Sequence, residues 1–344
     1  MFISLRYIPL FTIISVVINL AVIYLCNRFK IGIDHRSHGK HKLHSQPIPR
    51  LGGIGIYLPF VITFLFFQSN KVADSKFIFV SSLIFVLGVY EDIFKNTSAN
   101  LRFVMIAAIS FLSLLFLDED AVVKNIGFEL PFYFAVLFTV FAFTGIINSI
   151  NIIDGLNGLA SGVSLTVIFF MSLIAYQNSY VNIYNLLFCL GGSLIGFFII
   201  NFFTGKIFLG DAGAYFIGFI LAIISSIISN RSYGKISPWF FVILLNYPIV
   251  DTLFSIYRRL LKKKNVFKAD FMHMHTLVYK IVFRDQMQAS FFVIVVNFFF
   301  SYIGYLFKNN TPVLVGIFLL YGLSYIMGYR LILKKRCSKV FENS

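Results

Sequence analysis

The chain has 344 residues, of which 58% are hydrophobic and only 12% are charged, and its apolar residues form long runs. This composition excludes a water-soluble fold, because soluble domains carry about twice that share of charged residues. The formal net charge of +15 is spread over short segments between the runs, which argues against nucleic-acid binding and indicates a membrane protein oriented by its basic loops.

Eleven apolar runs follow one another along the chain and are predicted to be membrane-spanning helices. A helix of about 20 residues rises about 30 Å, enough to cross the hydrocarbon, and lipid tolerates no other open backbone form. We therefore expect an all-α polytopic membrane protein in which residues 1–344 form one integral membrane domain. The runs lie near 7–26, 52–68, 77–90, 101–117, 131–150, 157–175, 183–203, 212–229, 238–257, 290–307 and 312–332.

Basic residues indicate which loops face the cytoplasm. The first run is expected to be retained rather than cleaved, since only Arg6 precedes it and no small-x-small cleavage site closes it. If the loop after it is inside, the inner loops and tail hold 22 of the 29 Lys and Arg residues. This asymmetry predicts the N-terminus outside and the C-terminus inside.

The loops rich in Asp, Asn, His, Gly and Pro all fall on the predicted inner side. A transporter would more naturally place polar groups near the bilayer midplane, at broken helices. The gathering of polar residues at one interface therefore favours a reaction site at the cytoplasmic surface. The loops lie near 27–51, 91–100, 148–158, 204–211 and 258–289.

The first two inner loops supply basic and acidic candidates. The first contains HSQPIPRLGG, in which His44 and Arg50 flank a Pro- and Gly-containing turn and are candidate substrate-binding residues. The second begins with Glu91 and Asp92 at the end of an apolar run. Adjacent acids often mark only a solvated helix end. These two are candidates mainly because other polar loops lie on the same predicted side of the membrane.

The third and fourth inner loops suit a metal ion and phosphates. On a helix, Asn151, Asp154 and Asn157 would project into one sector of about 120°, and such oxygen ligands suit a hydrated divalent cation. Asp211 in TGKIFLGDAGA stands at a helix start, where backbone amides, Lys206 and a carboxylate could bind a pyrophosphate and Mg²⁺. The alternatives are an ordinary Gly-rich turn and an ordinary helix cap.

The last inner loop and the run before it contain a carboxylate and two histidines. Asp251 lies in an apolar run, where a carboxylate needs a partner or a polar cavity. His273 and His275 stand in DFMHMHTL without a cysteine partner, so we expect them to donate to phosphates rather than to bind zinc.

Taken in chain order, these segments resemble the polyprenyl-phosphate N-acetylhexosamine-1-phosphate transferases over residues 34 to about 280. The resemblance is carried by HSQPIPRLGG, GVYEDIFK, NIIDGLNGLASG, KIFLGDAGAYFIG, the Asp251 run and DFMHMHTL. It implies that Asp211 binds the metal and that Asn151 shares it, with Mg²⁺ as the expected ion and Mn²⁺ as an alternative. It also implies that Asp154, Glu91 and Asp92 are the catalytic acids.

The resemblance implies a reaction in which undecaprenyl phosphate attacks a UDP-N-acetylhexosamine and UMP is released. The expected location is the cytoplasmic face of the bacterial inner membrane. The expected product starts a cell-surface glycan such as O-antigen, and a homodimer is compatible with the family. The donor is expected to be UDP-GlcNAc or a UDP-deoxy-N-acetylhexosamine.

Asp92 or Asp154 could orient or deprotonate the lipid phosphate, or one acid could form a covalent intermediate. Single displacement is favoured, because a phosphate already ionised at pH 7 gains little from a covalent detour.

This chain departs from the family pattern at four positions. Glu91 replaces the usual first Asp, Asn157 stands where many members have Asp, Phe271 replaces a basic residue, and Thr276 replaces a third histidine.

The main alternative function is a transporter or flippase for an anionic lipid or nucleotide-sugar. A CDP-alcohol transferase is disfavoured because the sequence lacks a D-G-x-x-A-R segment.

Overall fold

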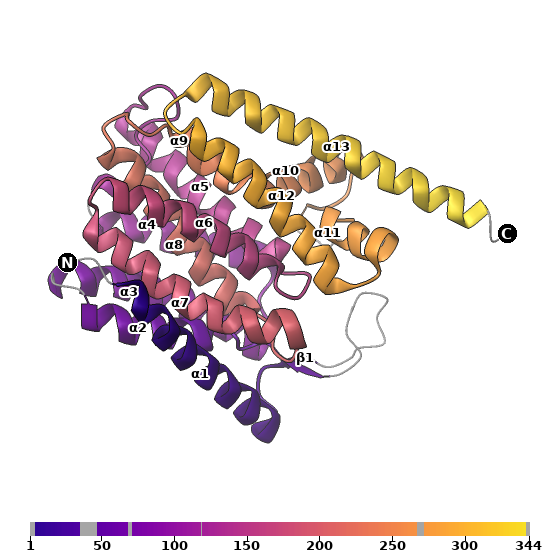
Figure 1. The fold of residues 1–344 in the computed structure, drawn as a ribbon, viewed down its shortest axis with the longest axis horizontal. Coiled ribbons are helices and arrows are strands. Elements are labelled where there is room, and N and C mark those ends of the chain that lie inside the picture. Colours follow the sequence, from indigo (N-terminus) through magenta and orange to yellow (C-terminus); the bar gives the residue numbers. More distant parts are fainter. Residues whose placement is uncertain (1–3, 35–46, 68–70, 118, 267–271, 342–344) are drawn as a thin grey trace.

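The computed structural model describes residues 4–34, 47–67, 71–117, 119–266 and 272–341, which form a bundle of helices with one very short hairpin (Figure 1). The elements are η1 (Leu5–Tyr7), α1 (Ile8–Phe29), β1 (Ile33–Asp34), β2 (Ile48–Pro49), α2 (Ile54–Phe67), α3 (Lys71–Phe94), α4 (Ala99–Phe116), η2 (Glu119–Ala121), α5 (Phe132–Ile153), α6 (Leu159–Gln177), α7 (Val181–Thr204), α8 (Gly210–Arg231), α9 (Pro238–Leu244), α10 (Asn246–Leu261), α11 (Met274–Leu277), η3 (Val278–Phe283), α12 (Gln286–Leu306) and α13 (Thr311–Phe341).

The predicted all-α membrane fold is confirmed. In the described part of the chain, nine helices are long and apolar enough to cross a membrane, and α9 with α10 makes a tenth if the bent pair is one span. The run near 52–68 became the shorter helix α2. The count of about eleven spans and the orientation of the termini stay predictions.

The run near 238–257 is a broken helix rather than a straight span. α9 and α10 meet at Leu245 at an angle of 78°. Pro248 lacks the N–H that would bond to the carbonyl of Leu244 four residues earlier, which is why the helix breaks here. The amide of Asn297 on α12 donates to that carbonyl at 3.5 Å. The break turns α10 and its Asp251 towards the polar end of the bundle.

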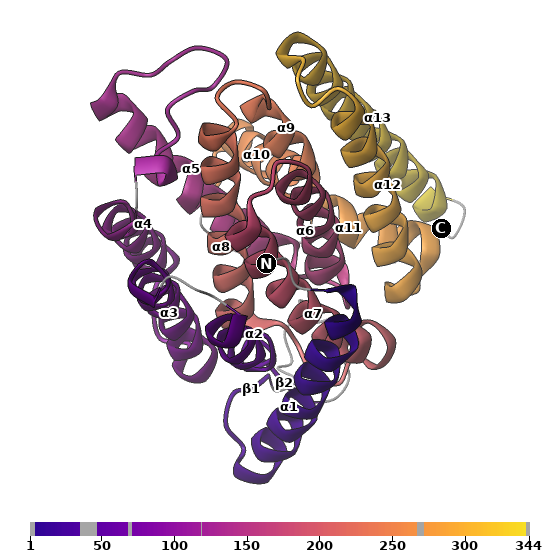
Figure 2. The same cartoon turned by 60° about the vertical axis from the view of Figure 1, so that its left-hand side comes forward.

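Helix α8 forms the centre of the bundle. Most of its residues are buried, and it packs mainly against α3 and α5 (Figure 2). Glycines let neighbouring chains approach its first turn closely: a Cβ on Gly53 would lie 2.4 Å from the nitrogen of Gly213, and one on Gly88 would lie 2.3 Å from the Cα of Ala212. The start of α8 is therefore held tightly between α2 and α3.

Backbone hydrogen bonds tie the first inner loop to the turn before α8. β1 and β2 pair antiparallel, with Ile33 opposite Pro49. Beyond the hairpin, the N–H groups of Gly52 and Gly53 donate to the carbonyls of Phe208 and Leu209, each at 3.0 Å. These bonds bring Arg50 beside the turn that contains Asp211.

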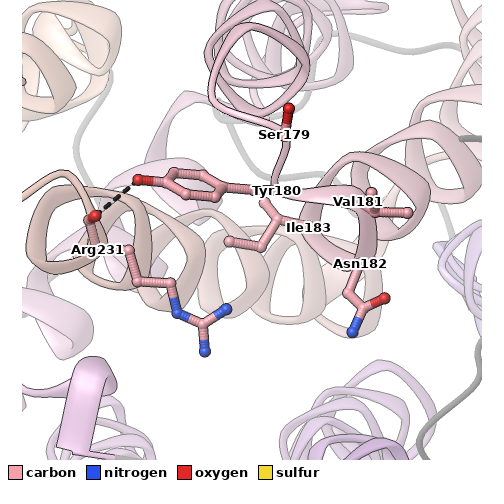
Figure 3. A pocket seen from close by; sticks show the side chains of 6 residues that line it. All are labelled: Ser179, Tyr180, Val181, Asn182, Ile183 and Arg231. Carbon is pink, nitrogen blue, oxygen red and sulfur yellow. Dashed lines mark hydrogen bonds between the residues drawn. The ribbon is translucent and has the colours of Figure 1, made fainter. Parts of the chain in front are cut away.

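The opposite end of the bundle has a different character. A pocket of about 300 Å³ lies between the start of α7 and the end of α8 (Figure 3). The hydroxyl of Tyr180 donates to the carbonyl of Arg231 at 2.7 Å, and the guanidinium of Arg231 pairs with Asp120 at 2.8 Å. The residues that line this pocket include none of the predicted site residues.

Candidate active site

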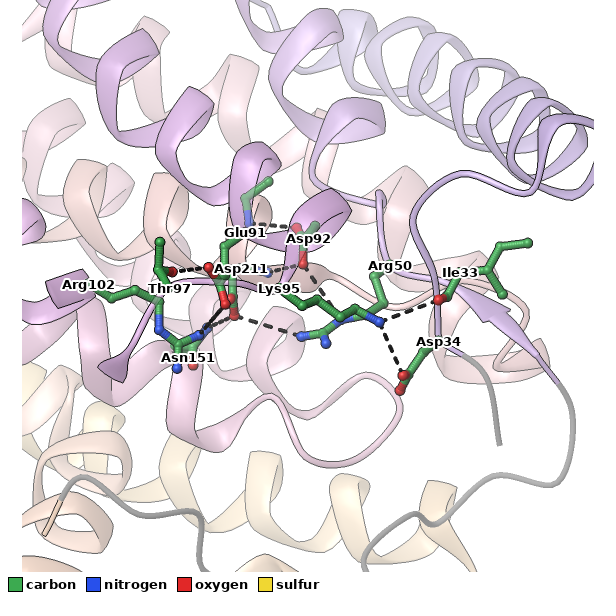
Figure 4. Close-up of polar contacts among 11 residues, drawn as sticks. Ile33, Asp34, Arg50, Glu91, Asp92, Lys95, Thr97, Arg102, Asn151 and Asp211 are labelled. Carbon is green, nitrogen blue, oxygen red and sulfur yellow. Dashed lines mark hydrogen bonds and ion pairs between the residues drawn. The ribbon is translucent and has the colours of Figure 1, made fainter. Parts of the chain in front are cut away.

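Several predicted site residues meet at the start of α8 (Figure 4). They come from segments far apart in the sequence, because the ends of α3 and α5 and the starts of α4 and α8 lie together. The predicted side chains are Arg50 before α2, Glu91 and Asp92 in the last turn of α3, Asn151 in the last turn of α5 and Asp211 in the first turn of α8; Arg102, in the first turn of α4, lies among them although it was not predicted.

Asp92 holds the start of α8 from a different helix. Its side chain is fully buried, and its two carboxylate oxygens accept the backbone N–H groups of Asp211 and Ala212, each at 2.9 Å. The first N–H groups of a helix have no partner within the helix, and negative charge is favoured beside them. Gly210, at φ +74°, allows the approach, since a Cβ there would lie 2.5 Å from Asp92 Oδ2. The sequence left open that Asp211 is only an ordinary helix cap. In the structure it is Asp92, and not Asp211, that caps the start of α8.

The carboxylate of Asp211 instead faces into the cluster. Its Oδ1 accepts from the Asn151 amide at 2.6 Å, and its Oδ2 accepts from the Arg102 guanidinium at 3.2 Å. Arg50 Nη2 lies 3.9 Å from Asp211 Oδ1. The predicted pair of Asp211 and Asn151 is thus in direct contact, between two arginines.

Glu91 points towards α4 and belongs to the same network. Its Oε1 accepts from Arg102 Nη1 at 3.3 Å, and its Oε2 accepts from the hydroxyl of Thr97. Because the same nitrogen of Arg102 also contacts Asp211, this guanidinium joins the two carboxylates.

Asp154 and Arg50 complete the cluster from the loop between α5 and α6 and from the segment before α2. Burial raises the pKa of Asp154 to about 7; Arg50 and the backbone N–H of Gly210 oppose the rise, and Asp211 adds to it. Burial works to lower the pKa of Arg50, but the carboxylates around it, Asp211 foremost, raise that pKa above its usual value. Arg50 therefore stays charged, while Asp154 can change protonation near neutral pH.

A second group forms around Asp251 on α10. The side chain of Asp251 is fully buried. Its Oδ2 lies 2.6 Å from His273 Nδ1, and its Oδ1 accepts the backbone N–H of Met274 at 3.0 Å and the hydroxyl of Tyr325 at 2.6 Å. The sequence predicted that a carboxylate in this apolar run needs a partner or a polar cavity. The structure confirms this, because three donors from outside the run bind Asp251. The side chain of His273 is 11% exposed, so its ring reaches the surface of the group.

His275 connects the two groups. Its ring stacks on that of His273 with centroids 5.5 Å apart, and its Nδ1 lies 2.9 Å from the hydroxyl of Tyr247. Its Nε2 lies so close to Gly155 that a Cβ there would be 2.7 Å away. Gly155 is next to Asp154, so the histidine loop lies directly against the loop that carries Asp154. Burial lowers the pKa of His275 to about 4, and its imidazole is therefore neutral at pH 7.

The remaining predicted residues are placed outside these contacts. Asn157 is partly buried, its N–H donates to Gln286 at 3.4 Å, and its amide packs against Gly205. The side chain of Lys206 is exposed, and Thr276 is buried in α11. His44 and Phe271 lie outside the described residues.

The sequence interpretation missed four side chains that contact the acids and histidines of these two groups. Arg102 stands at the edge of an apolar run, where a basic residue is also expected from membrane orientation alone. Thr97 and Tyr247 have no distinctive spacing. Tyr325 belongs to a series of tyrosines spaced by four on α13, a pattern that usually means only a packed helix face. The four are Thr97, Arg102, Tyr247 and Tyr325.

The cluster around Asp211 has more acidic than basic side chains, so a cation could bind there. Glu91, Asp92, Asp154 and Asp211 stand against Arg50 and Arg102, so when ionised the carboxylates outnumber the arginines by two. In the described segments no group of three or more His, Cys, Asp or Glu side chains is arranged to hold a metal ion. A carboxylate and an amide oxygen, from Asp211 and Asn151, nevertheless fit an ion such as Mg²⁺, which keeps several waters and takes its other ligands from substrate phosphates.

Fold and site together define a polytopic α-helical membrane protein with a charged site at the end of its central helix. Residues 75–229 match the family described as "Glycosyl transferase family 4". A "Probable undecaprenyl-phosphate N-acetylglucosaminyl 1-phosphate transferase" of Bacillus subtilis is 30% identical over 313 residues, covering 87% of this chain and 83% of that protein.

Two further relatives extend the comparison. An "Undecaprenyl-phosphate alpha-N-acetylglucosaminyl 1-phosphate transferase" of Thermotoga maritima is 30% identical, over 68% of this chain and 69% of that protein. A "Phospho-N-acetylmuramoyl-pentapeptide-transferase" of Clostridium botulinum is 25% identical, over 76% of this chain and 84% of that protein. The chain belongs to the polyprenyl-phosphate N-acetylhexosamine-1-phosphate transferase family, as its motifs predicted.

Proposed function

We propose that this chain transfers an N-acetylhexosamine-1-phosphate from a UDP-sugar to undecaprenyl phosphate and releases UMP. The observation that carries the proposal is the contact of Asp211 with Asn151, Arg50 and Arg102 beside Asp154. These groups suit two phosphorylated substrates, whose charges must be offset before they can react. The names of the relatives support a polyprenyl-phosphate acceptor.

In the proposed reaction, an oxygen of the lipid phosphate attacks the sugar-linked phosphorus of the donor. The bond from this phosphorus to the bridging oxygen breaks, a new pyrophosphate forms, and UMP leaves with the bridging oxygen. At pH 7 the lipid phosphate is already largely ionised, since its second pKa is near 6. The main tasks of the protein are therefore alignment and charge stabilisation.

We assign Asp211 and Asn151 to a Mg²⁺ ion, with Mn²⁺ as an alternative. When bound, such an ion neutralises charge on the donor pyrophosphate and the leaving phosphate. Arg102 and Arg50 hold the Asp211 carboxylate from two sides and can turn their remaining N–H groups to phosphate oxygens. His273 offers its Nε2 to the donor because its Nδ1 is bonded to Asp251.

Among the acids, we assign Asp154 to the acceptor phosphate. Its pKa of about 7 suits a group that accepts a proton from the monoprotonated phosphate near neutral pH. We assign Asp92 to positioning, because both its oxygens already bind the first turn of α8. Because most of the acceptor is already ionised at pH 7, a covalent intermediate would add little, and single displacement is favoured.

The proposed location is the cytoplasmic face of the bacterial inner membrane. The isoprenoid chain must stay in lipid while its phosphate reaches the polar end of the bundle, so the site needs an opening at the interface. The predicted inner excess of Lys and Arg suits anionic substrates arriving from that side.

The deciding experiment measures UMP release by the purified protein in detergent with undecaprenyl phosphate and a panel of UDP-sugars. A transferase releases UMP without a closed compartment, whereas a transporter or flippase gives no product under these conditions. Asp120→Asn is a matched control for Asp211→Asn, because Asp120 pairs with an arginine at the opposite end of the bundle. The control should keep full activity, and no UMP with any donor would overturn the proposal.

The donor is proposed to be UDP-GlcNAc or a UDP-deoxy-N-acetylhexosamine, feeding a cell-surface glycan such as O-antigen. Phe271 stands where the family pattern has a basic residue, and its apolar side chain favours a sugar that lacks a hydroxyl. Phe271→Arg should therefore shift the turnover ratio towards UDP-GlcNAc, within the roughly 10- to 200-fold range of pocket-fit effects. An unchanged ratio would show that Phe271 does not contact the sugar.

A further inference from the structure

The buried carboxylate of Asp251 is held by a residue of the last helix. Its two oxygens accept from three donors: His273 Nδ1 at 2.6 Å, the Met274 N–H at 3.0 Å and the Tyr325 hydroxyl at 2.6 Å. The histidine and the amide belong to one loop, but Tyr325 belongs to α13, about 50 residues further along the chain. A fully buried carboxylate depends on such donors for its orientation.

The donors divide between the two oxygens in a way that fixes the histidine. Tyr325 and the Met274 N–H both bind Oδ1, so Oδ2 is left facing His273. The carboxylate accepts the proton on Nδ1, and this sets the direction in which Nε2 points. Loss of the tyrosine hydroxyl would leave Oδ1 with one donor and would let the carboxylate, and with it the imidazole, rotate.

Helix α13 is built to bring this hydroxyl to Asp251. Tyr321, Tyr325 and Tyr329 recur every four residues and are all buried, so they lie on one face of α13. The rings of Tyr325 and Tyr329 pack edge-on against Phe254 of α10, with centroids 5.5 and 4.7 Å away. These contacts hold α13 against α10 one turn from Asp251.

We propose that Tyr325 is a positioning residue that orients His273 for the donor phosphates through Asp251. The inference rests on the proposed function and adds a residue of α13 to it, beyond residues 75–229 that match the family. Tyr325 touches neither substrate. It acts by limiting the rotation of the carboxylate that fixes the imidazole.

The test is a double-mutant cycle between Tyr325→Phe and His273→Ala, read as KM for the UDP-sugar and as kcat. Tyr325→Phe keeps the ring packing and removes one hydrogen bond to a carboxylate, so KM should rise about tenfold while kcat changes less than about twofold. In the His273→Ala background the same change should have no further effect, because the group that Tyr325 positions is gone. A purely structural role would give the same loss in both backgrounds.

Tyr329→Phe is the matched control, because it sits one turn along the same helix, packs on the same phenylalanine, and its hydroxyl takes no part in the hydrogen bonds to Asp251. It should leave KM unchanged. Additive effects of Tyr325→Phe and His273→Ala, or an unchanged KM in Tyr325→Phe, would overturn the positioning role while parent activity still supported the proposed function. An inactive parent would overturn both.

Discussion

The carboxylates of Asp92 and Asp211 lie side by side at the start of α8, but replacement by Asn should affect different properties: stability for Asp92 and turnover for Asp211. Asp92→Asn replaces a buried carboxylate that accepts two backbone N–H groups at 2.9 Å each. Its amide can still accept one of these bonds, but its NH₂ group then faces the second N–H. Hydrogen bonds to a charged group are worth about 1.5–3 kcal/mol, so we expect Asp92→Asn to lower the free energy of unfolding by about 2 kcal/mol.

Asp211→Asn should leave stability almost unchanged, because Asp211 stands among other carboxylates and its amide replacement can still accept from Arg102. Its loss should instead remove the charge that holds Mg²⁺. We expect turnover to fall at least about a hundredfold, or roughly 2.7 kcal/mol of activation free energy. Glu91→Gln should reduce turnover less, since Glu91 contacts Asp211 only through Arg102.

Both quantities can be measured on the same detergent-purified protein. Thermal unfolding can be followed with a thiol-reactive dye in a Cys337→Ser background, because Cys26 and Cys189 are buried until the protein unfolds. Turnover is measured as UMP release. If Asp92→Asn unfolded at the parent temperature yet lost all activity, its carboxylate would act on substrate, and the assignment of Asp92 to the cap of α8 would be wrong.

Three further predictions concern topology, metal and pH. A cysteine introduced at Ser45 or Ala269 should be shielded from an impermeant thiol reagent in intact cells, and one at Glu119 should be labelled; labelling at Ser45 would refute the inner-face orientation. Removal of divalent ions by EDTA should abolish UMP release, and Mg²⁺ or Mn²⁺ should restore it; full activity in EDTA would refute the metal assignment. His275 has a folded-state pKa of about 4, below the ordinary 6.5, so its contribution to stability is complete above pH 6.5 and is lost as pH falls towards 4. Between pH 6.5 and 5 this loss is about 2 kcal/mol, and the unfolding temperature of His275→Asn should be less sensitive to pH over that range than that of the parent; equal sensitivity would show that the imidazole is not buried in its neutral form.

The class of fold and most members of the site could be predicted from the amino-acid sequence. Long apolar runs can satisfy their backbone only as helices in lipid, so the all-helical bundle followed from composition and spacing. Polar residues in the loops between apolar runs, taken together, predicted the motif residues, and the structure places five of them together: Arg50, Asp92, Asn151, Asp154 and Asp211.

The contacts that each of these residues makes depend on how distant helices pack, and they could not be predicted from the sequence. Helix periodicity cannot tell that Asp92 caps a helix more than 100 residues later, because that contact depends on how α3 packs against α8 through Gly88. It likewise cannot show that Arg102 joins Glu91 to Asp211, or that Tyr325 reaches Asp251. Hydrogen bonds act over about 3 Å, and which groups come within that distance is set by the packing of helices far apart in the chain.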